Sequence, residues 1–180
     1  LRDTLDQRPE LIETRGEDGK TLLWEATRAG KAEAVDFLIE AGSDLNAPGL
    51  RRPSYSLTTP PETLVMTTPY CVAKLRKHDQ IAEMLLEMGA IVDVFTSALL
   101  GDRDALAYML DEDPRLANVT DPAEDVFPVT PLHNAVCGQH RDVADLLLDR
   151  DAEVPDHSVG LLTIAARRNA MPLGRLLIDH

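Results

Sequence analysis

Aromatic residues, cysteine and long apolar runs are all scarce in this chain of 180 residues. Aromatics make up 4 % of it, and its two cysteines are Cys71 and Cys137. No apolar run approaches the ~18 residues that a membrane-spanning helix needs, so we expect no membrane association. Two cysteines so far apart do not suggest a disulfide framework, and they favour a reducing compartment such as the cytoplasm.

Basic residues are also in the minority. There are 18 Lys and Arg against 31 Asp and Glu, which gives a formal net charge of -13. A sequence-independent nucleic-acid binder needs cations to displace counterions, so we expect no nucleic-acid partner. Apolar residues are 44 % and charged residues 27 % of the chain, as in globular proteins. The length suits one domain or a short array of repeats, and we expect a single domain over residues 1–180.

The common catalytic and cofactor motifs are missing as well. The chain has no glycine-rich phosphate loop, no Cys-x-x-Cys, no His-Glu-x-x-His and no Gly-x-Ser-x-Gly. No pair of residues stands out as nucleophile and base, or as acid and base. We therefore predict no enzyme activity and no cofactor.

One sequence pattern recurs along the chain. Its strongest copy is Thr130-Pro131-Leu132-His133-Asn134-Ala135, and further copies begin at 21, 68, 92 and 160. From the start of each copy, apolar residues recur at offsets 13, 14, 16, 17 and 18, which is typical of a wide apolar helix face. Residues expected to end helices recur at offset 9 (Gly30, Lys77, Gly101, Gln139, Asn169) and at offset 21 (Gly42, Gly89, Asp113, Asp151). This regularity predicts pairs of antiparallel helices.

The repeated unit resembles the ankyrin repeat, whose Thr-Pro-Leu-His-x-Ala motif is complete at 130–135. The resemblance implies an all-α solenoid in which each repeat has a β-turn finger, an inner helix, an outer helix and a loop. We expect about five repeats, starting near 17, 64, 91, 126 and 156, after an N-terminal half-repeat at 1–15. Residues of about 48–66 form an insertion with several prolines, and the third copy follows too closely on the second to hold a finger. The native protein either extends beyond residues 1–180 or leaves its end helices uncapped.

The resemblance also bears on possible metal ligands. His133 and Cys137 are four residues apart and would share a helical face, as metal ligands sometimes do. The family motif instead implies a structural hydrogen bond between His133 and Thr130. Cys71 and Trp24 occupy the motif's His position in their own copies, so we expect both to be packed in the core, although Trp24 has the alternative role of a ligand platform. We predict no metal site.

Partners of ankyrin-like stacks usually contact the finger tips and the exposed face of the inner helices. The residues at these positions are Lys20, Arg28, Leu75, Arg76, Leu99, Leu100, Val129, Arg167 and Arg168. They predict a concave groove with leucines in its centre and arginines on its flanks, whereas the surplus acid lies on the outer helices. Such a groove suits an acidic or partly apolar protein segment. The alternative is that these side chains are ordinary surface residues.

The insertion is a second candidate for contacts with a partner. Arg51, Arg52, Tyr55 and Leu57 give it cationic, aromatic and apolar side chains on a loop too long for a plain connector. The alternative is a loop without a selected function.

These observations favour a monomeric, non-catalytic protein-interaction module whose partner the sequence does not identify. An alternative is a regulatory or targeting domain of a longer multidomain protein. A third hypothesis, an enzyme with its site at the gap in the third copy, would need a buried carboxylate pair.

Overall fold

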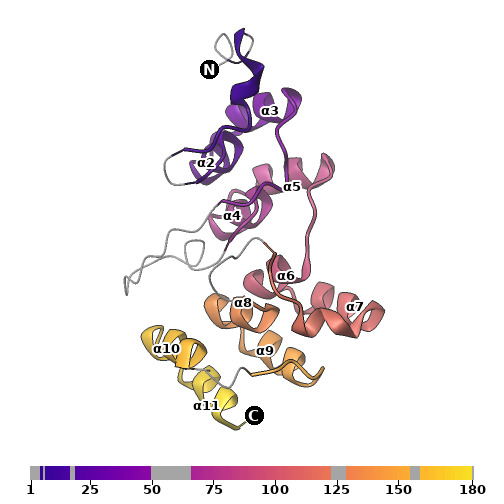
Figure 1. Cartoon of the computed structure of the whole chain (residues 1–180), viewed down its shortest axis with the longest axis vertical. Helices are drawn as coiled ribbons and strands as arrows, with labels where there is room; N and C mark the ends of the chain where they lie inside the picture. Colours follow the sequence, from indigo (N-terminus) through magenta and orange to yellow (C-terminus); the bar gives the residue numbers. More distant parts are fainter. Residues whose placement is uncertain are drawn as a thin grey trace. The chain divides into compact units, whose positions relative to one another are not determined.

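The computed structural model describes residues 5, 7–16, 19–49, 66–122, 129–154 and 159–179. Within these residues the chain is helical, and two isolated β-bridges take the place of strands. The described residues divide into two compact units, one that ends at residue 92 and one that begins at residue 93. Figure 1 shows the helices in chain order. The prediction of an all-α fold is confirmed for the described residues.

The first unit contains two pairs of antiparallel helices. Its elements are η1 (Pro9–Leu11), α2 (Leu22–Arg28), α3 (Ala32–Glu40), α4 (Pro69–Leu75) and α5 (Asp79–Glu87). The inner helix α2 packs on α4, and the outer helix α3 packs on α5. Leu23, Leu38 and Leu85 are almost fully buried in the core between them, and Leu5 joins the same core.

The second unit repeats this arrangement. Its elements are α6 (Val94–Leu100), α7 (Arg103–Glu112), η3 (Pro114–Asn118), α8 (Pro131–Gly138), α9 (Arg141–Leu148), α10 (Val159–Arg167) and α11 (Met171–Asp179). Helices α6, α8 and α10 pack in series, and so do α7, α9 and α11. Leu106, Leu132 and Leu147 lie in one continuous core, each with its side chain excluded from solvent.

A side-chain oxygen caps each inner helix from α2 to α8. Thr21, Thr68 and Thr130 accept a hydrogen bond from the backbone N–H three residues later, as expected for N-cap residues. In α6 the cap is Asp93, whose Oδ1 accepts from the Thr96 N–H at 2.7 Å. The repeat frame placed this start at 92, and that position is wrong by one residue because Val92 has no oxygen with which to cap a helix.

The ends of the helices follow the predicted pattern closely. All five residues at offset 9 have positive φ, including the non-glycine residues Lys77, Gln139 and Asn169. At offset 21, Gly42, Gly89 and Asp151 also have positive φ. Asp113 differs, with φ of -141°, because its carboxylate accepts from the Arg115 N–H and caps η3 instead. That carboxylate also accepts hydrogen bonds from the Arg115 side chain, and these bonds lower the pKa of Asp113.

Replacing Gln139 with glycine should stabilise the second unit. Gln139 has φ of 66° and an exposed side chain, so glycine removes the steric cost of the left-handed conformation and loses little contact. We expect a gain of about 1 kcal/mol in the free energy of unfolding. Urea denaturation followed by circular dichroism would measure it, and Gly101→Ala, which puts a side chain at φ of 78°, should show the opposite sign.

The two isolated bridges close the turns that lead into α2 and α4. Arg15 pairs with Thr21 around the first turn, and Gly49 pairs with Thr67 at the ends of the predicted insertion. The Gly49 N–H donates to the Thr67 carbonyl at 3.0 Å. Only residues 88–93 separate α5 from α6, so the chain has no comparable turn there.

Candidate protein-binding surface

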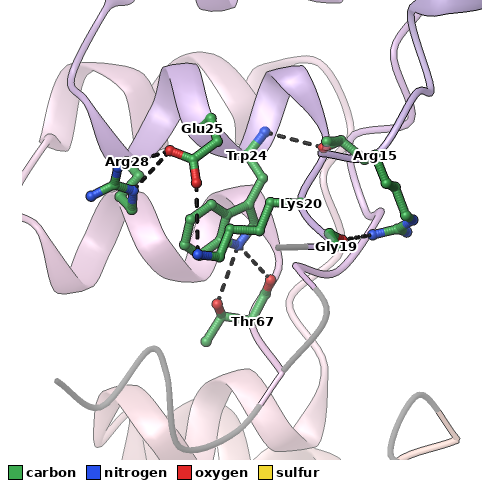
Figure 2. A network of polar contacts seen from close by, with 8 residues as sticks. Arg15, Gly19, Lys20, Trp24, Glu25, Arg28 and Thr67 are labelled. Carbon is green, nitrogen blue, oxygen red and sulfur yellow. Dashed lines mark hydrogen bonds and ion pairs between the residues drawn. The ribbon is translucent and has the colours of Figure 1, made fainter. Parts of the chain in front are cut away.

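Two of the predicted basic residues share one carboxylate in the first unit. Lys20 lies just before α2, and Arg28 ends it. Lys20 Nζ is 3.7 Å from Glu25 Oε1, and Arg28 Nη2 is 2.8 Å from Glu25 Oε2. Figure 2 shows Glu25 lying between the two cations. The three side chains together keep a net positive charge, and the ion pair made by the exposed Arg28 holds its partner only weakly.

Trp24 lies directly beneath Lys20. Its side chain is 1 % exposed, and its Nε1 donates to the Thr67 carbonyl at 2.9 Å. Lys20 Nζ is 4.7 Å from the centre of the ring, within the range of a cation–π interaction. The expectation that Trp24 is packed is confirmed, and its ring helps to hold the Lys20 ammonium in place (Figure 2).

Glycine is required at position 49, where the backbone of the Gly49–Thr67 bridge lies against the Trp24 indole. A Cβ at Gly49 would lie 2.7 Å from Trp24 Nε1, closer than side-chain atoms approach one another. Glycine therefore allows the backbone at the start of the predicted insertion to rest against the indole. The recurring pattern did not single out this contact.

Arg15 is a further residue that the repeat pattern missed. Its Nη1 donates to the carbonyls of Gly19, at 2.7 Å, and Pro48, at 2.6 Å. Arg15 thus ties the first turn to the chain just before Gly49. Arg15 lies outside the recurring offsets, so the repeat pattern did not indicate this role.

The surface continues on α4, the next inner helix. Leu75 is half-buried and Arg76 is exposed. Lys74 Nζ donates to Asp79 Oδ1 at 3.1 Å, and this hydrogen bond raises the pKa of Lys74. Lys74 therefore carries its charge at neutral pH, although a neighbouring carboxylate offsets it.

Two of the residues predicted to contact a partner in the second unit are buried, so the prediction is wrong for them. Leu99 is 1 % exposed and Val129 is 3 % exposed, so neither offers its side chain to a partner. The end of α6 keeps the predicted frame, because the Asp102 N–H donates to the Ser97 carbonyl as the His140 N–H donates to the Ala135 carbonyl in α8. In this frame Leu99 corresponds to Cys137 of α8, which is also buried, and not to an exposed position such as Arg28 of α2. The Val129 carbonyl accepts a hydrogen bond from the Asp121 N–H.

The other predicted contacts of the second unit remain accessible. Leu100 and Arg168 are half-buried, and Arg167 is exposed at the end of α10. The insertion contacts Arg51, Arg52, Tyr55 and Leu57 lie outside the described residues.

The residues considered as metal ligands have structural roles. His133 Nδ1 is 3.1 Å from Thr130 Oγ1, and the two residues form a capping box at the start of α8, which confirms the implied hydrogen bond. Cys71 and Cys137 are buried in the core. Across the described part of the chain, no group of three or more His, Cys, Asp or Glu is placed to hold a metal ion.

In the same part, no helix has both the length and the apolarity to cross a membrane.

Comparison with known families identifies two segments. The family model described as the ankyrin repeat matches residues 18–50 and 129–157. The first segment contains α2 and α3, and the second contains α8 and α9. The resemblance read from the Thr-Pro-Leu-His motif is confirmed for these segments. No curated protein matches the chain significantly.

Proposed function

Because the chain contains ankyrin repeats, we propose that it is a non-catalytic module that binds an acidic or partly apolar segment of a partner protein. Ankyrin repeats are generally protein–protein interaction modules, and stacked repeats present an extended concave face. The proposed contacts lie on the inner helices and the turns that precede them.

The arrangement around Glu25 is the observation that carries this proposal. Lys20 and Arg28 are both ion-paired with the Glu25 carboxylate. A carboxylate of the partner protein would bind beside Glu25 or take its place. Arg28 is exposed, so exchanging Glu25 for a carboxylate of the partner costs little there, whereas Lys20 is half-buried. Complementary charge would steer an acidic segment to this surface and set its register.

The remaining contacts follow from accessibility. In the first unit they are Leu75 and Arg76, and in the second unit Leu100, Arg167 and Arg168. The half-buried leucines would provide the apolar part of the contact. Leu99 and Val129 are no longer included because they are buried.

We also keep the insertion as a proposed contact. Arg51, Arg52, Tyr55 and Leu57 follow Gly49 closely in the sequence. Gly49 lies against Trp24, which in turn lies under Lys20. A partner held at Lys20 would therefore be near the point where the insertion begins.

Charge reversal tests the proposal. The variant Arg76→Glu with Arg167→Glu changes one exposed cation in each unit and should lose an acidic partner captured from the source organism's lysate. The matched control is Arg103→Glu with Arg175→Glu, which makes the same change at exposed positions on the outer helices α7 and α11. A partner retained by the wild type and the control but lost by the first variant supports the proposal. Equal retention by all three proteins would overturn its electrostatic part, and circular dichroism would check that each variant keeps its helices.

A further inference from the structure

We propose that the end of α5 is a second docking surface, which binds a basic amphipathic segment of a partner protein. The surface consists of Leu86, Met88 and Ile91, here called the exit patch. Their side chains are 42 %, 56 % and 62 % exposed. All three belong to the first unit and lie at the end of the outer helix α5 that is opposite to its junction with α4.

The equivalent positions in α3 and α9 are less exposed or less apolar than those of α5, although Ile178 of α11, which matches Leu86, is also exposed. In α3 and α9 the residues that match Leu86 are Ile39 and Leu148, which are 9 % and 8 % exposed. Met88 is matched by Ala41 and Arg150, and Ile91 by Asp44 and Glu153. Two positions that are small or polar elsewhere thus carry large apolar side chains here. A cluster of such side chains on a surface indicates an interaction site more often than a single exposed one does.

The backbone equivalence of these positions rests on a shared hydrogen bond. The Ile91 N–H donates to Asn46 Oδ1 at 2.8 Å. The Asp44 N–H donates to Glu13 Oε1 at 2.8 Å, and the Glu153 N–H to Asn118 Oδ1 at 2.7 Å. In each case the acceptor is a side chain that precedes the helix pair in the sequence. The three loops therefore have the same local attachment and differ in their side chains.

This attachment also fixes the exit patch in place. The Met88 N–H donates to the Met84 carbonyl at 3.1 Å, and the Ala90 N–H to the Leu85 carbonyl at 2.9 Å. Gly89, between them, has φ of 95°, and an added Cβ there would meet no atom within 4 Å. The patch is thus open to the outside on a hydrogen-bonded backbone, so binding would require little ordering of this loop.

The charges around the patch define the chemistry of its partner. The neighbouring outer helices α3 and α5 pack side by side. Their exposed faces carry Asp36, Glu40, Glu83 and Glu87, and neither helix contains Lys or Arg. An apolar patch beside exposed carboxylates fits a segment with apolar residues on one face and basic residues next to them. This charge preference is opposite to that proposed for the inner-helix surface.

The test uses the full chain and a labelled amphipathic peptide of lysine and leucine, with the leucines at helical spacing. The variant Met88→Ala with Ile91→Asp gives the α5 exit the residues found at the α3 exit, so it should fold normally. We expect it to bind the peptide about tenfold more weakly or worse, because it loses two large apolar contacts. The variant adds one negative charge, so a purely electrostatic attraction to the basic peptide would strengthen instead.

Met171→Ala with Ile178→Asp is the matched control. These residues of α11 are 61 % and 70 % exposed, and the chemical change is the same. The control should bind the lysine–leucine peptide as tightly as the wild type does. A peptide with serine in place of leucine should bind only weakly to the wild type and to the control. Fluorescence anisotropy would measure each affinity.

Five results would overturn the proposal. The first is unchanged binding of the lysine–leucine peptide by the exit-patch variant. The second is an equal loss of binding in the α11 control, and the third is equally tight binding of the serine peptide. Either of these last two results would indicate a non-specific effect. The fourth is a self-association of the wild type, seen by sedimentation and abolished in the exit-patch variant, which would identify a second copy of the chain as the occupant. A lower melting temperature of the exit-patch variant would likewise count against it, because the chain itself would then cover the patch.

Discussion

Replacing Trp24 with alanine should lower the free energy of unfolding of the first unit by about 3–5 kcal/mol. The indole is 1 % exposed, lies against Gly49 and donates to the Thr67 carbonyl. Its loss would leave a large cavity between the two helix pairs and a buried carbonyl without its donor. Because domains are stable by only ~5–15 kcal/mol, the first unit should unfold in mild denaturant. Urea titration followed by circular dichroism would measure the change.

Trp24→Phe separates packing from hydrogen bonding at this position. Phenylalanine keeps most of the apolar contact but has no N–H for the Thr67 carbonyl, so we expect a cost of about 1–2 kcal/mol. If the phenylalanine variant is as unstable as the alanine variant, the packing explanation fails. If neither variant changes stability, Trp24 does not join the two helix pairs in solution.

Leu106→Asp should divide unfolding into two separate steps. Leu106 is fully buried in the core of the second unit, where an aspartate would place a charge among apolar side chains. We expect a loss of more than about 4 kcal/mol in the stability of that unit. Repeat proteins are stabilised chiefly by neighbouring contacts, so the first unit should remain folded after the second has lost its structure.

The position of the chain's single tryptophan makes this outcome measurable. Trp24 lies in the first unit, so its fluorescence reports on that unit, whereas circular dichroism reports on the helices of both. For Leu106→Asp the circular dichroism signal should begin to fall at lower urea than the fluorescence signal. Tyr108→Asp is the control, because this residue of the same helix is 69 % exposed and its change should cost less than about 0.5 kcal/mol. Coincident transitions in Leu106→Asp would show that the two units unfold together.

The helices were predictable because their start and stop signals are local. Thr130 and His133 form the expected capping box, and Lys77 and Gln139 have positive φ although their side chains are poorly suited to it. These helix ends could be predicted because the pattern recurs at the same offsets, whereas the residue type at one position would not have indicated them. The pattern failed in two places at α6: Asp93 caps the helix one residue later than expected, and Leu99 is buried although its offset predicted an exposed position.

The surface was only partly predictable because its contacts are not periodic. Lys20 and Arg28 were identified from their offsets. The Glu25–Arg28 pair follows from helix spacing, but the Lys20–Glu25 pair depends on the path of the turn before α2. The role of Arg15 depends on Pro48, far along the chain, and no offset identifies such a pair. The exit patch did leave a signal, since Met88 and Ile91 replace Ala41 and Asp44 at matching offsets.

The bridge between Gly49 and Thr67 has a consequence for how this chain tolerates changes in length. The bridge holds two points of the backbone side by side, and the Trp24 indole contacts both residues. The entropy of closing a flexible loop rises slowly, by about 0.6 kcal/mol for each doubling of its length. Sequences of very different length are therefore compatible with the same two anchor points. A foreign peptide placed between Gly49 and Thr67 should be displayed there without loss of the helix pairs on either side, which makes this bridge a natural grafting point.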